Sequence, residues 1–143
     1  MYVALMLEVG IMRSEEVEEV IHLEYDVLGV SPFVATSLLP LKRKVVVARV
    51  KGTIAGCATV CWNDRFEIAS LAVKKEYRNT GVGTAIIEKC VEIAKKLGFN
   101  RIWLETPENG PVEFYESNGF SIEKLVKNMY GNGISGLKMV KQI

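Results

Sequence analysis

Residues 77–85 read Tyr77-Arg78-Asn79-Thr80-Gly81-Val82-Gly83-Thr84-Ala85 and lie between a predicted strand and a predicted helix. Because Gly81 and Gly83 carry no Cβ, the backbone can turn tightly and its N–H groups can converge on one point at the helix start. Such a point favours an anion. Arg78 adds a planar guanidinium that suits phosphate oxygens. The segment therefore predicts a phosphate or pyrophosphate ligand.

Two common phosphate-binding motifs do not fit these residues. A P-loop places Gly-Lys-Ser/Thr at the helix start, whereas Gly83 is followed by Thr84 and Ala85. A dinucleotide fingerprint needs Gly or Ala at its sixth position, which here is Ile86. The antiparallel strands predicted upstream also conflict with a doubly wound parallel sheet. Nucleoside triphosphate hydrolysis and Rossmann-type binding are both disfavoured.

The chain after this segment predicts one long helix over 80–97 and three further strands. Gly98 follows the helix as a typical terminating residue, and the apolar stripe of the helix consists of Val82, Ile86, Cys90, Ile93 and Leu97. A strand over 101–106 should lie parallel to the strand over 66–73, since strand–helix–strand units form right-handed crossovers. A short helix over 111–117 precedes a hairpin of 120–127 and 134–140.

The chain before this segment predicts an antiparallel meander and a first helix. Strands over 44–50 and 53–62 flank the turn Lys51-Gly52, and a third strand covers 66–73. Ser14 is a suitable N-cap for a helix over 14–28, whose apolar positions are Val17, Val20, Ile21, Val27 and Leu28. Its acidic face, expected to be solvated, comprises Glu15, Glu16, Glu18, Glu19 and Asp26. Residues 1–8 predict a first strand, and residues 30–41 a loop or short helix.

These elements predict the fold class α/β (α+β type). The sheet should be mixed, mostly antiparallel and of about seven strands, flanked by helices in a single domain over residues 1–143. The composition, 49% hydrophobic and 24% charged, excludes disordered and collagen-like chains. A net charge of +1 provides no bulk field for nucleic acid or anionic lipid.

The cysteines and the N-terminus bear on compartment and metal binding. Cys57, Cys61 and Cys90 lie in apolar segments and are expected to be buried thiols in a reducing compartment. With His22 as the only histidine, the residues favour no metal site. The apolar start is far shorter than the roughly 20 residues that span a bilayer. We therefore expect a cytoplasmic protein with no nucleic-acid or membrane partner.

Two motifs resemble one known family. Residues 78–83 match in full the Arg/Gln-x-x-Gly-x-Gly/Ala signature of the GNAT superfamily of acetyl-CoA-dependent N-acetyltransferases, which wraps the pyrophosphate of coenzyme A. Phe114-Tyr115-Glu116-Ser117-Asn118-Gly119-Phe120 resembles the family's Leu/Phe-Tyr-Glu-x-x-Gly-Phe segment. The order of elements agrees along essentially the whole chain. The resemblance implies that acetyl-CoA is the co-substrate and that its acetyl group passes to a primary amine by direct nucleophilic attack.

The resemblance also implies site residues. The strand over 66–73 should splay from that over 101–106, and the pantetheine arm should enter the gap. Tyr115 is implied as proton donor to the departing thiolate, or else only packs beneath the cofactor. Glu67 is implied as a general base acting through water, or else only faces solvent. The residues implied to bind the cofactor are Leu71, Ala72, Val73, Arg78, Asn79, Thr80, Gly81, Val82, Gly83, Thr84, Asn109 and Tyr115.

Some features depart from the family or stay open. The family often has an asparagine where this chain has Glu108, and Asn109 lies one residue later. The acceptor amine, a protein N-terminus, a lysine or a small molecule, is implied to contact residues 28–41 and 128–135, and the acidic face of the first helix favours a cationic one. A non-catalytic acetyl-CoA sensor or regulatory module and a purely structural module are alternatives. An exposed edge of the final hairpin leaves a homodimer open.

Overall fold

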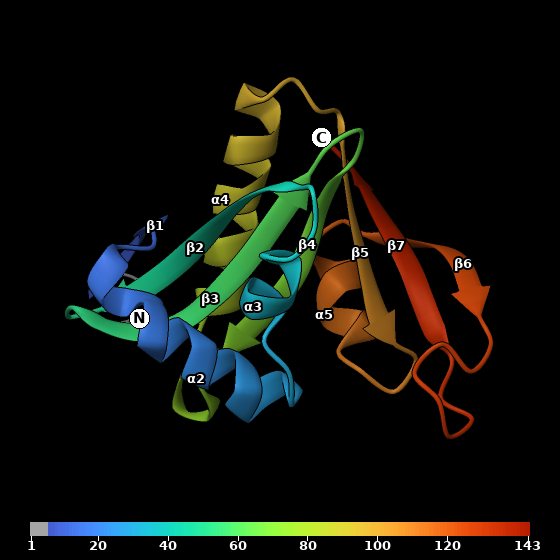
Figure 1. Ribbon diagram of the computed structural model, residues 1–143, viewed down its shortest axis with the longest axis horizontal. Coiled ribbons are helices and arrows are strands. Elements are labelled where there is room, and N and C mark those ends of the chain that lie inside the picture. The colour runs from blue at the N-terminus through green and yellow to red at the C-terminus, as the bar shows by residue number, and fades with distance from the viewer. Residues whose placement is uncertain (1–5) are drawn as a thin grey trace.

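The computed structural model describes residues 6–143, in which seven strands form one mixed sheet of order β1-β2-β3-β4-β5-β7-β6 (Figure 1). The strands are β1 (Leu7–Ile11), β2 (Lys42–Val50), β3 (Thr53–Trp62), β4 (Phe66–Val73), β5 (Arg101–Pro107), β6 (Ser121–Val126) and β7 (Gly136–Gln142). The helices are α2 (Val17–Leu28), α3 (Pro32–Thr36), α4 (Val82–Lys96) and α5 (Val112–Ser117), with 3-10 turns η1 (Ser14–Glu16) and η2 (Lys75–Tyr77). The predicted fold class is confirmed.

The predicted antiparallel meander is observed, whereas the first strand agrees with its predicted range only in part. Lys51 and Gly52 join β2 to β3 with φ of 52° and 79°, the left-handed conformation that a two-residue hairpin turn requires. β4 pairs antiparallel with β3, as predicted. Of the strand predicted over residues 1–8, residues 1–5 lie outside the described residues, and the observed strand begins at Leu7. No helix within residues 6–143 is long and apolar enough to cross a membrane.

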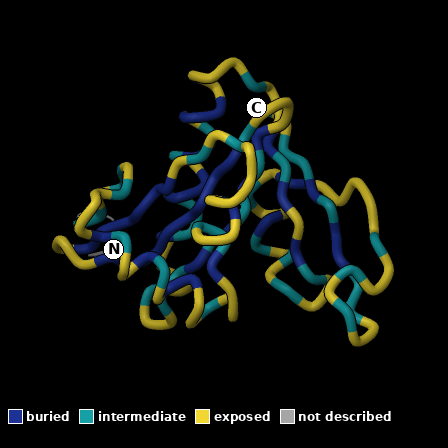
Figure 2. The backbone as a smooth tube through the Cα atoms, viewed as in Figure 1, coloured by how far each residue is buried: buried dark blue, intermediate teal, exposed yellow. Residues whose placement is uncertain are grey.

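The sheet separates two apolar cores, and most of β2 and β3 is buried (Figure 2). The larger core lies against α4 and the smaller against α2. Three residues of α2 are buried, namely Val20, Leu23 and Glu24, whereas Leu28 at its end is 40% exposed and was wrongly assigned to the apolar face. The prediction that Leu97 belongs to the apolar stripe of α4 was also wrong, since Leu97 is the C-cap residue and is 45% exposed. The three cysteines are buried, as predicted.

β4 leaves its parallel neighbour soon after the two strands meet. It pairs with β5 only at Glu67↔Trp103 and Ile68↔Leu104, and the two strands separate towards their C-terminal ends (Figure 1). At the same place the register with β3 shifts, because Val60 pairs with Ile68 but Thr59 pairs with Ser70. Ala69 is therefore the extra residue of a β-bulge. The splayed strand pair that the family resemblance implied is confirmed.

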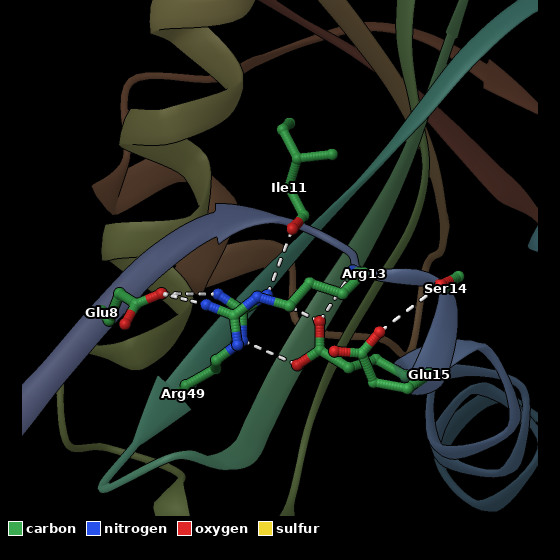
Figure 3. Close-up of polar contacts among 7 residues, drawn as sticks. Glu8, Ile11, Arg13, Ser14, Glu15 and Arg49 are labelled. Atoms are coloured by element: carbon green, nitrogen blue, oxygen red, sulfur yellow. Dashed lines mark hydrogen bonds and ion pairs between the residues drawn. The ribbon is translucent and has the colours of Figure 1, made fainter.

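A buried guanidinium ties β1 and the start of α2 to β2 (Figure 3). The Nε and NH2 groups of Arg49 donate to the two carboxylate oxygens of Glu16 at 2.7 and 2.6 Å, and its NH1 group donates to Glu8 at 2.8 Å. Glu16 was expected on a solvated face but is buried by this pair. Ser14 is not the N-cap, since it lies inside η1 after the cap residue Arg13.

Candidate functional site

The predicted anion site begins at the start of α4. Gly81 is the N-cap residue, with φ of +90°, and Asn79 has φ of +60°. No oxygen within residues 6–143 accepts a hydrogen bond from the backbone N–H groups of residues 79–84, the first internal bond of the helix being Ala85 N–H to the Gly81 carbonyl. Arg78 is exposed, and its Nε donates to the Val73 carbonyl at 3.4 Å. These donors fit a pyrophosphate group.

The second glycine brings this loop against α5. A Cβ at Gly83 would lie 2.8 Å from Cζ of Phe114, so only glycine allows the ring to approach this closely. The Phe114 ring contacts Tyr115 edge-on at 5.4 Å between centroids, and Tyr115 contacts Phe120 at 5.9 Å. The two sequence motifs are therefore packed together, beside the end of β4 from which β5 has separated.

Tyr115 is the most strongly perturbed phenol of the described residues. It is 8% exposed, and burial, with a smaller effect from nearby Tyr130, raises its pKa to about 12. The hydroxyl makes no side-chain hydrogen bond within residues 6–143, and it is not among the polar atoms that are fully buried without a partner. The phenol is thus a protonated group that is available to an incoming ligand.

Glu67 lies away from Tyr115. It is half-buried on β4, paired across the sheet with Cys61 on one side and Trp103 on the other, before the bulge. Leu71 lies four positions further along the strand, a span of about 13 Å. A carboxylate at this distance can reach an amine near the end of β4 only through water.

Asn109 lies in the exposed turn between β5 and α5. Glu108, which stands where the family often has asparagine, connects this turn to the loop before β7. The backbone N–H of Glu108 donates to the Ser135 carbonyl at 2.9 Å, and its carboxylate accepts from Ser135 N–H at 3.2 Å. Glu108 therefore holds the two loops together, and Asn109 stays a predicted contact of the cofactor.

None of the cysteines offers a reactive thiolate. Burial raises the pKa of Cys90 to about 12 and also raises the pKa of Cys57 and of Cys61.

Trp62 and Trp103 are half-buried within strands, as expected, and Arg65 lies 3.5 Å above the Trp103 ring.

Sequence reasoning missed one buried polar group near this site. Glu24 of α2 is fully buried and hydrogen-bonds to Ser70 of β4, next to the bulge. A signal was present, because Glu24 lies three residues after Ile21 and three before Val27, inside the apolar face predicted for this helix. A carboxylate in that position must be satisfied by buried donors.

Comparisons with known proteins agree with this geometry. A family model for the acetyltransferase (GNAT) family matches residues 13–120. An uncharacterized N-acetyltransferase of Methanocaldococcus jannaschii is 37% identical over 79 residues, which cover 54% of this chain and 32% of that protein. The match therefore spans about a third of that relative's length.

Solved structures show the same fold. Ard1 from Thermoplasma volcanium superimposes with a TM-score of 0.82 at 17% identity, covering 96% of this chain and 98% of its own. A putative streptothricin acetyltransferase from Bacillus anthracis, solved in complex with acetyl coenzyme A, gives a TM-score of 0.67 at 26% identity and covers 71% of this chain and 62% of its own. With the family model matching most of the sequence, this chain belongs to the acetyltransferase (GNAT) family of acyltransferase enzymes.

Proposed function

We propose that this protein transfers an acetyl group from acetyl-CoA to a primary amine by direct attack of the amine. The observation that carries the proposal is the row of N–H groups over residues 79–84, which have no partner within residues 6–143 and lie beside the gap between β4 and β5. The 26% identical Bacillus anthracis structure, solved in complex with acetyl coenzyme A, supports the choice of co-substrate.

The chain would bind acetyl-CoA mainly through its backbone. Residues 79–84 donate N–H groups to the pyrophosphate, and Arg78 adds a positive charge beside it. Leu71, Ala72 and Val73 lie beyond the last pairing with β5, so their backbone can pair with the amides of the pantetheine arm. One N–H group near Leu71 then polarises the thioester carbonyl. Acetyl-CoA itself supplies an activated acyl group with a thiolate leaving group.

Two side chains carry out the proton transfers, one from the amine and one to the departing sulfur. Glu67, acting through water, takes one proton from the attacking amine as the N–C bond forms. Tyr115 donates a proton to the sulfur as the C–S bond breaks, and then recovers a proton from solvent. The net change is one amide and one thiol from one amine and one thioester. Burial raises the pKa of Tyr115 to about 12, so the phenol carries its proton at neutral pH. Because a phenol is a weaker acid than a thiol, whose pKa is about 8.5, the donation requires close alignment of the hydroxyl with the departing sulfur.

Direct transfer is favoured over an acyl-enzyme route. A covalent route would need a nucleophilic thiolate, and burial keeps the Cys90 and Cys57 thiols protonated. His22, the only histidine, lies on the exposed surface of α2.

The acceptor is proposed only as a primary amine, in contact with residues 28–41 and 128–135. The preference for a cationic acceptor is weaker than the sequence suggested, because Glu16 is buried and paired with Arg49. Comparing cationic and neutral amines at low and high salt tests this preference, and equal rates for both classes would contradict it.

Calorimetry with acetyl-CoA, followed by thiol release with a panel of amines, tests the proposal. We expect saturable binding and acetyl-CoA-dependent thiol release with at least one peptide, lysine or amino-sugar acceptor. Gly83→Glu should abolish binding, because its side chain meets Phe114 and its charge repels the pyrophosphate. Asn100→Glu is the matched control, since it adds the same charge in the exposed loop between α4 and β5, beyond the far end of the helix.

The same experiment separates the alternatives. Binding without thiol release from any amine would indicate a coenzyme A sensor. Absence of binding, with Gly83→Glu indistinguishable from the unaltered protein, would indicate a structural module.

A further inference from the structure

The buried carboxylate of Glu24 accepts hydrogen bonds from four donors. Its Oε1 accepts from the Ser31 hydroxyl at 2.7 Å and from Phe33 N–H at 3.0 Å. Its Oε2 accepts from the Thr59 hydroxyl at 2.9 Å and from the Ser70 hydroxyl. Glu24 is fully buried, and it forms no ion pair with a lysine, arginine or histidine of residues 6–143. Hydrogen bonds alone therefore offset the cost of removing this carboxylate from water.

The two carboxylate oxygens face different parts of the molecule. Oε1 binds the start of α3, where Ser31 is the N-cap residue and accepts from Val34 N–H at 3.3 Å. This segment belongs to residues 28–41, which the proposed function places beside the acceptor. Oε2 binds β3 and β4 at Thr59 and Ser70. One rigid planar group thus links the acceptor segment to the central strands.

The contact on β4 falls at the bulge. Ser70 follows the extra residue Ala69, and its hydroxyl accepts from Thr59 N–H at 3.0 Å. This side-chain bond takes the place of a regular ladder bond, while the same hydroxyl donates to Glu24. In a regular strand, even- and odd-numbered residues point to opposite faces of the sheet. Because the bulge shifts this alternation, Leu71 and Val73 pack on the same α4 side as Phe66 and Ile68. Ser70, held by Glu24, therefore sets which way the next residue, Leu71, points.

We propose that Glu24 is a positioning residue, which fixes the β4 bulge so that the backbone near Leu71 is presented to the thioester, and which couples this bulge to the acceptor segment. The inference rests on the proposed function for its catalytic consequence. Its structural part, the control of the bulge by Glu24, does not depend on the activity.

Single substitutions separate the two halves of the network. Ser70→Ala removes the hydrogen bond to the bulge and leaves the contacts with α3 intact. Ser31→Ala removes one of the two hydrogen bonds to the α3 segment, together with the cap to Val34 N–H, and leaves the bond from Phe33 N–H and the contact with the bulge. Glu24→Ala removes the contacts with both the bulge and α3. Glu24→Gln is the conservative variant, because its amide oxygen can face Ser31 and Phe33 while its NH2 group donates to the Thr59 and Ser70 hydroxyl oxygens. Glu16→Ala is the matched control, a buried carboxylate on the preceding turn η1 that binds Arg49 instead.

Amide hydrogen exchange of the full chain without cofactor is the first readout. In Glu24→Ala and Ser70→Ala, we expect exchange at residues 69–71 to accelerate at least about tenfold relative to residues 86–96 of α4. Glu24→Gln should restore slow exchange. Ser31→Ala should accelerate exchange only around residues 31–36, and Glu16→Ala should leave the ratio between β4 and α4 unchanged.

Steady-state kinetics with acetyl-CoA and a reacting amine is the second readout. We expect kcat to fall about tenfold or more in Glu24→Ala and Ser70→Ala, because a small displacement of a polarising group is costly. Ser31→Ala should mainly raise KM for the amine. Glu24→Gln should recover most of kcat, and Glu16→Ala should retain kcat below its unfolding temperature.

The inference is overturned if Glu24→Ala accelerates exchange evenly over β4 and α4, or if it lowers kcat no more than Glu16→Ala does. An unaltered protein that binds no acetyl-CoA would refute the proposed function alone. The exchange ratios would then still decide whether Glu24 holds the bulge.

Discussion

At the scale of single residues, Gly81 and Gly83 lie two positions apart but require glycine for different reasons. Gly81 has φ of +90° with open space around its Cβ direction, so a side chain there would be strained but would touch nothing. Gly83 has an ordinary backbone conformation, but a Cβ would strike Phe114. Alanine at each position therefore separates backbone strain from packing.

We expect Gly83→Ala to weaken acetyl-CoA binding about tenfold and to lower stability by about 1–3 kcal/mol, because the Phe114 ring must move away from the loop. Gly81→Ala should cost about 1–2 kcal/mol of stability through strain, with a smaller loss of affinity. Calorimetry and urea unfolding measure both effects. Binding by Gly83→Ala equal to that of the unaltered protein would contradict the role of the Phe114 contact.

The raised pKa of Tyr115 predicts how its contribution to kcat depends on pH. A phenol with its pKa near 12 keeps its proton where an ordinary tyrosine, with a pKa of about 10, would be half ionised. The ratio of kcat between the unaltered protein and Tyr115→Phe should therefore exceed one and stay constant from about pH 7 to about pH 10. A ratio that halves by about pH 10 would show an unperturbed phenol, and a ratio of one would show that Tyr115 only packs.

At the scale of elements, two buried carboxylates hold α2, one at its start and one in its third turn. Glu16 binds Arg49 of β2 at the start, and Glu24 binds β3, β4 and α3 further along the helix. The bond from Arg49 lowers the pKa of Glu16 below its ordinary value of 4.5. A lowered pKa means that this stabilisation is present above about pH 4.5 and is lost as the pH falls through the folded-state pKa.

Glu16→Gln should accordingly lower the free energy of unfolding by about 3 kcal/mol at neutral pH, since it leaves the buried Arg49 short of a counter-charge. The difference from the unaltered protein should shrink as the pH falls below 4.5. Urea unfolding at pH values of about 7 and about 3 tests this. A difference that does not change with pH would exclude the ion pair as its cause.

Most elements were predictable because local signals mark their ends. Lys51-Gly52 and Gly98 marked the turn before β3 and the end of α4, and the observed bounds of β2, β3 and α4 lie within two residues of those predicted. β1 ends and α2 begins three residues later than predicted. The bulge at Ala69 was not predicted, because no glycine or proline marks it and its hydrogen bonds come from distant Glu24 and Thr59. Burial of Glu16 was missed for the same reason, since its partner lies 33 residues away.

The candidate site was predictable to a different extent. The loop over residues 78–84 has a local pattern, and its N–H groups from residue 79 onward find no acceptor in the described part of the chain, as that pattern requires. The contact between Gly83 and Phe114 depends on how α4 and α5 pack, which spacing alone does not determine. Roles for Tyr115, Glu67 and Asn109 stay predictions that the experiments above test.

At the scale of the whole molecule, the sheet is continuous at one end and divided at the other, between β4 and β5 (Figure 1). A ligand that pairs with the exposed edge of β4 and with the start of α4 would connect the two halves. Acetyl-CoA at about 100 times its Kd should stabilise the fold by about 2.7 kcal/mol. This corresponds to a rise in Tm of roughly 5–10 °C.

Thermal unfolding with and without acetyl-CoA measures this shift, and hydrogen exchange locates it. Protection should be concentrated at residues 71–73 and 79–84. Adenosine 3′,5′-bisphosphate, which keeps a 5′-phosphate but lacks the pantetheine arm, is the control and should leave residues 71–73 unprotected. Protection by acetyl-CoA that is confined to residues 121–142 would contradict the proposed site.

The proposed binding of acetyl-CoA by main-chain amides would have a consequence for how such a protein can diversify. Every amino acid except proline carries the same amide, so many replacements within residues 79–84 preserve the donors, provided that the glycines remain. Residues 29–41 and 127–135 lie in separate segments of the chain, outside the long strands and helices of the core. If the proposed acceptor segments are correct, mutations there would change the accepted amine while the acyl donor stays the same.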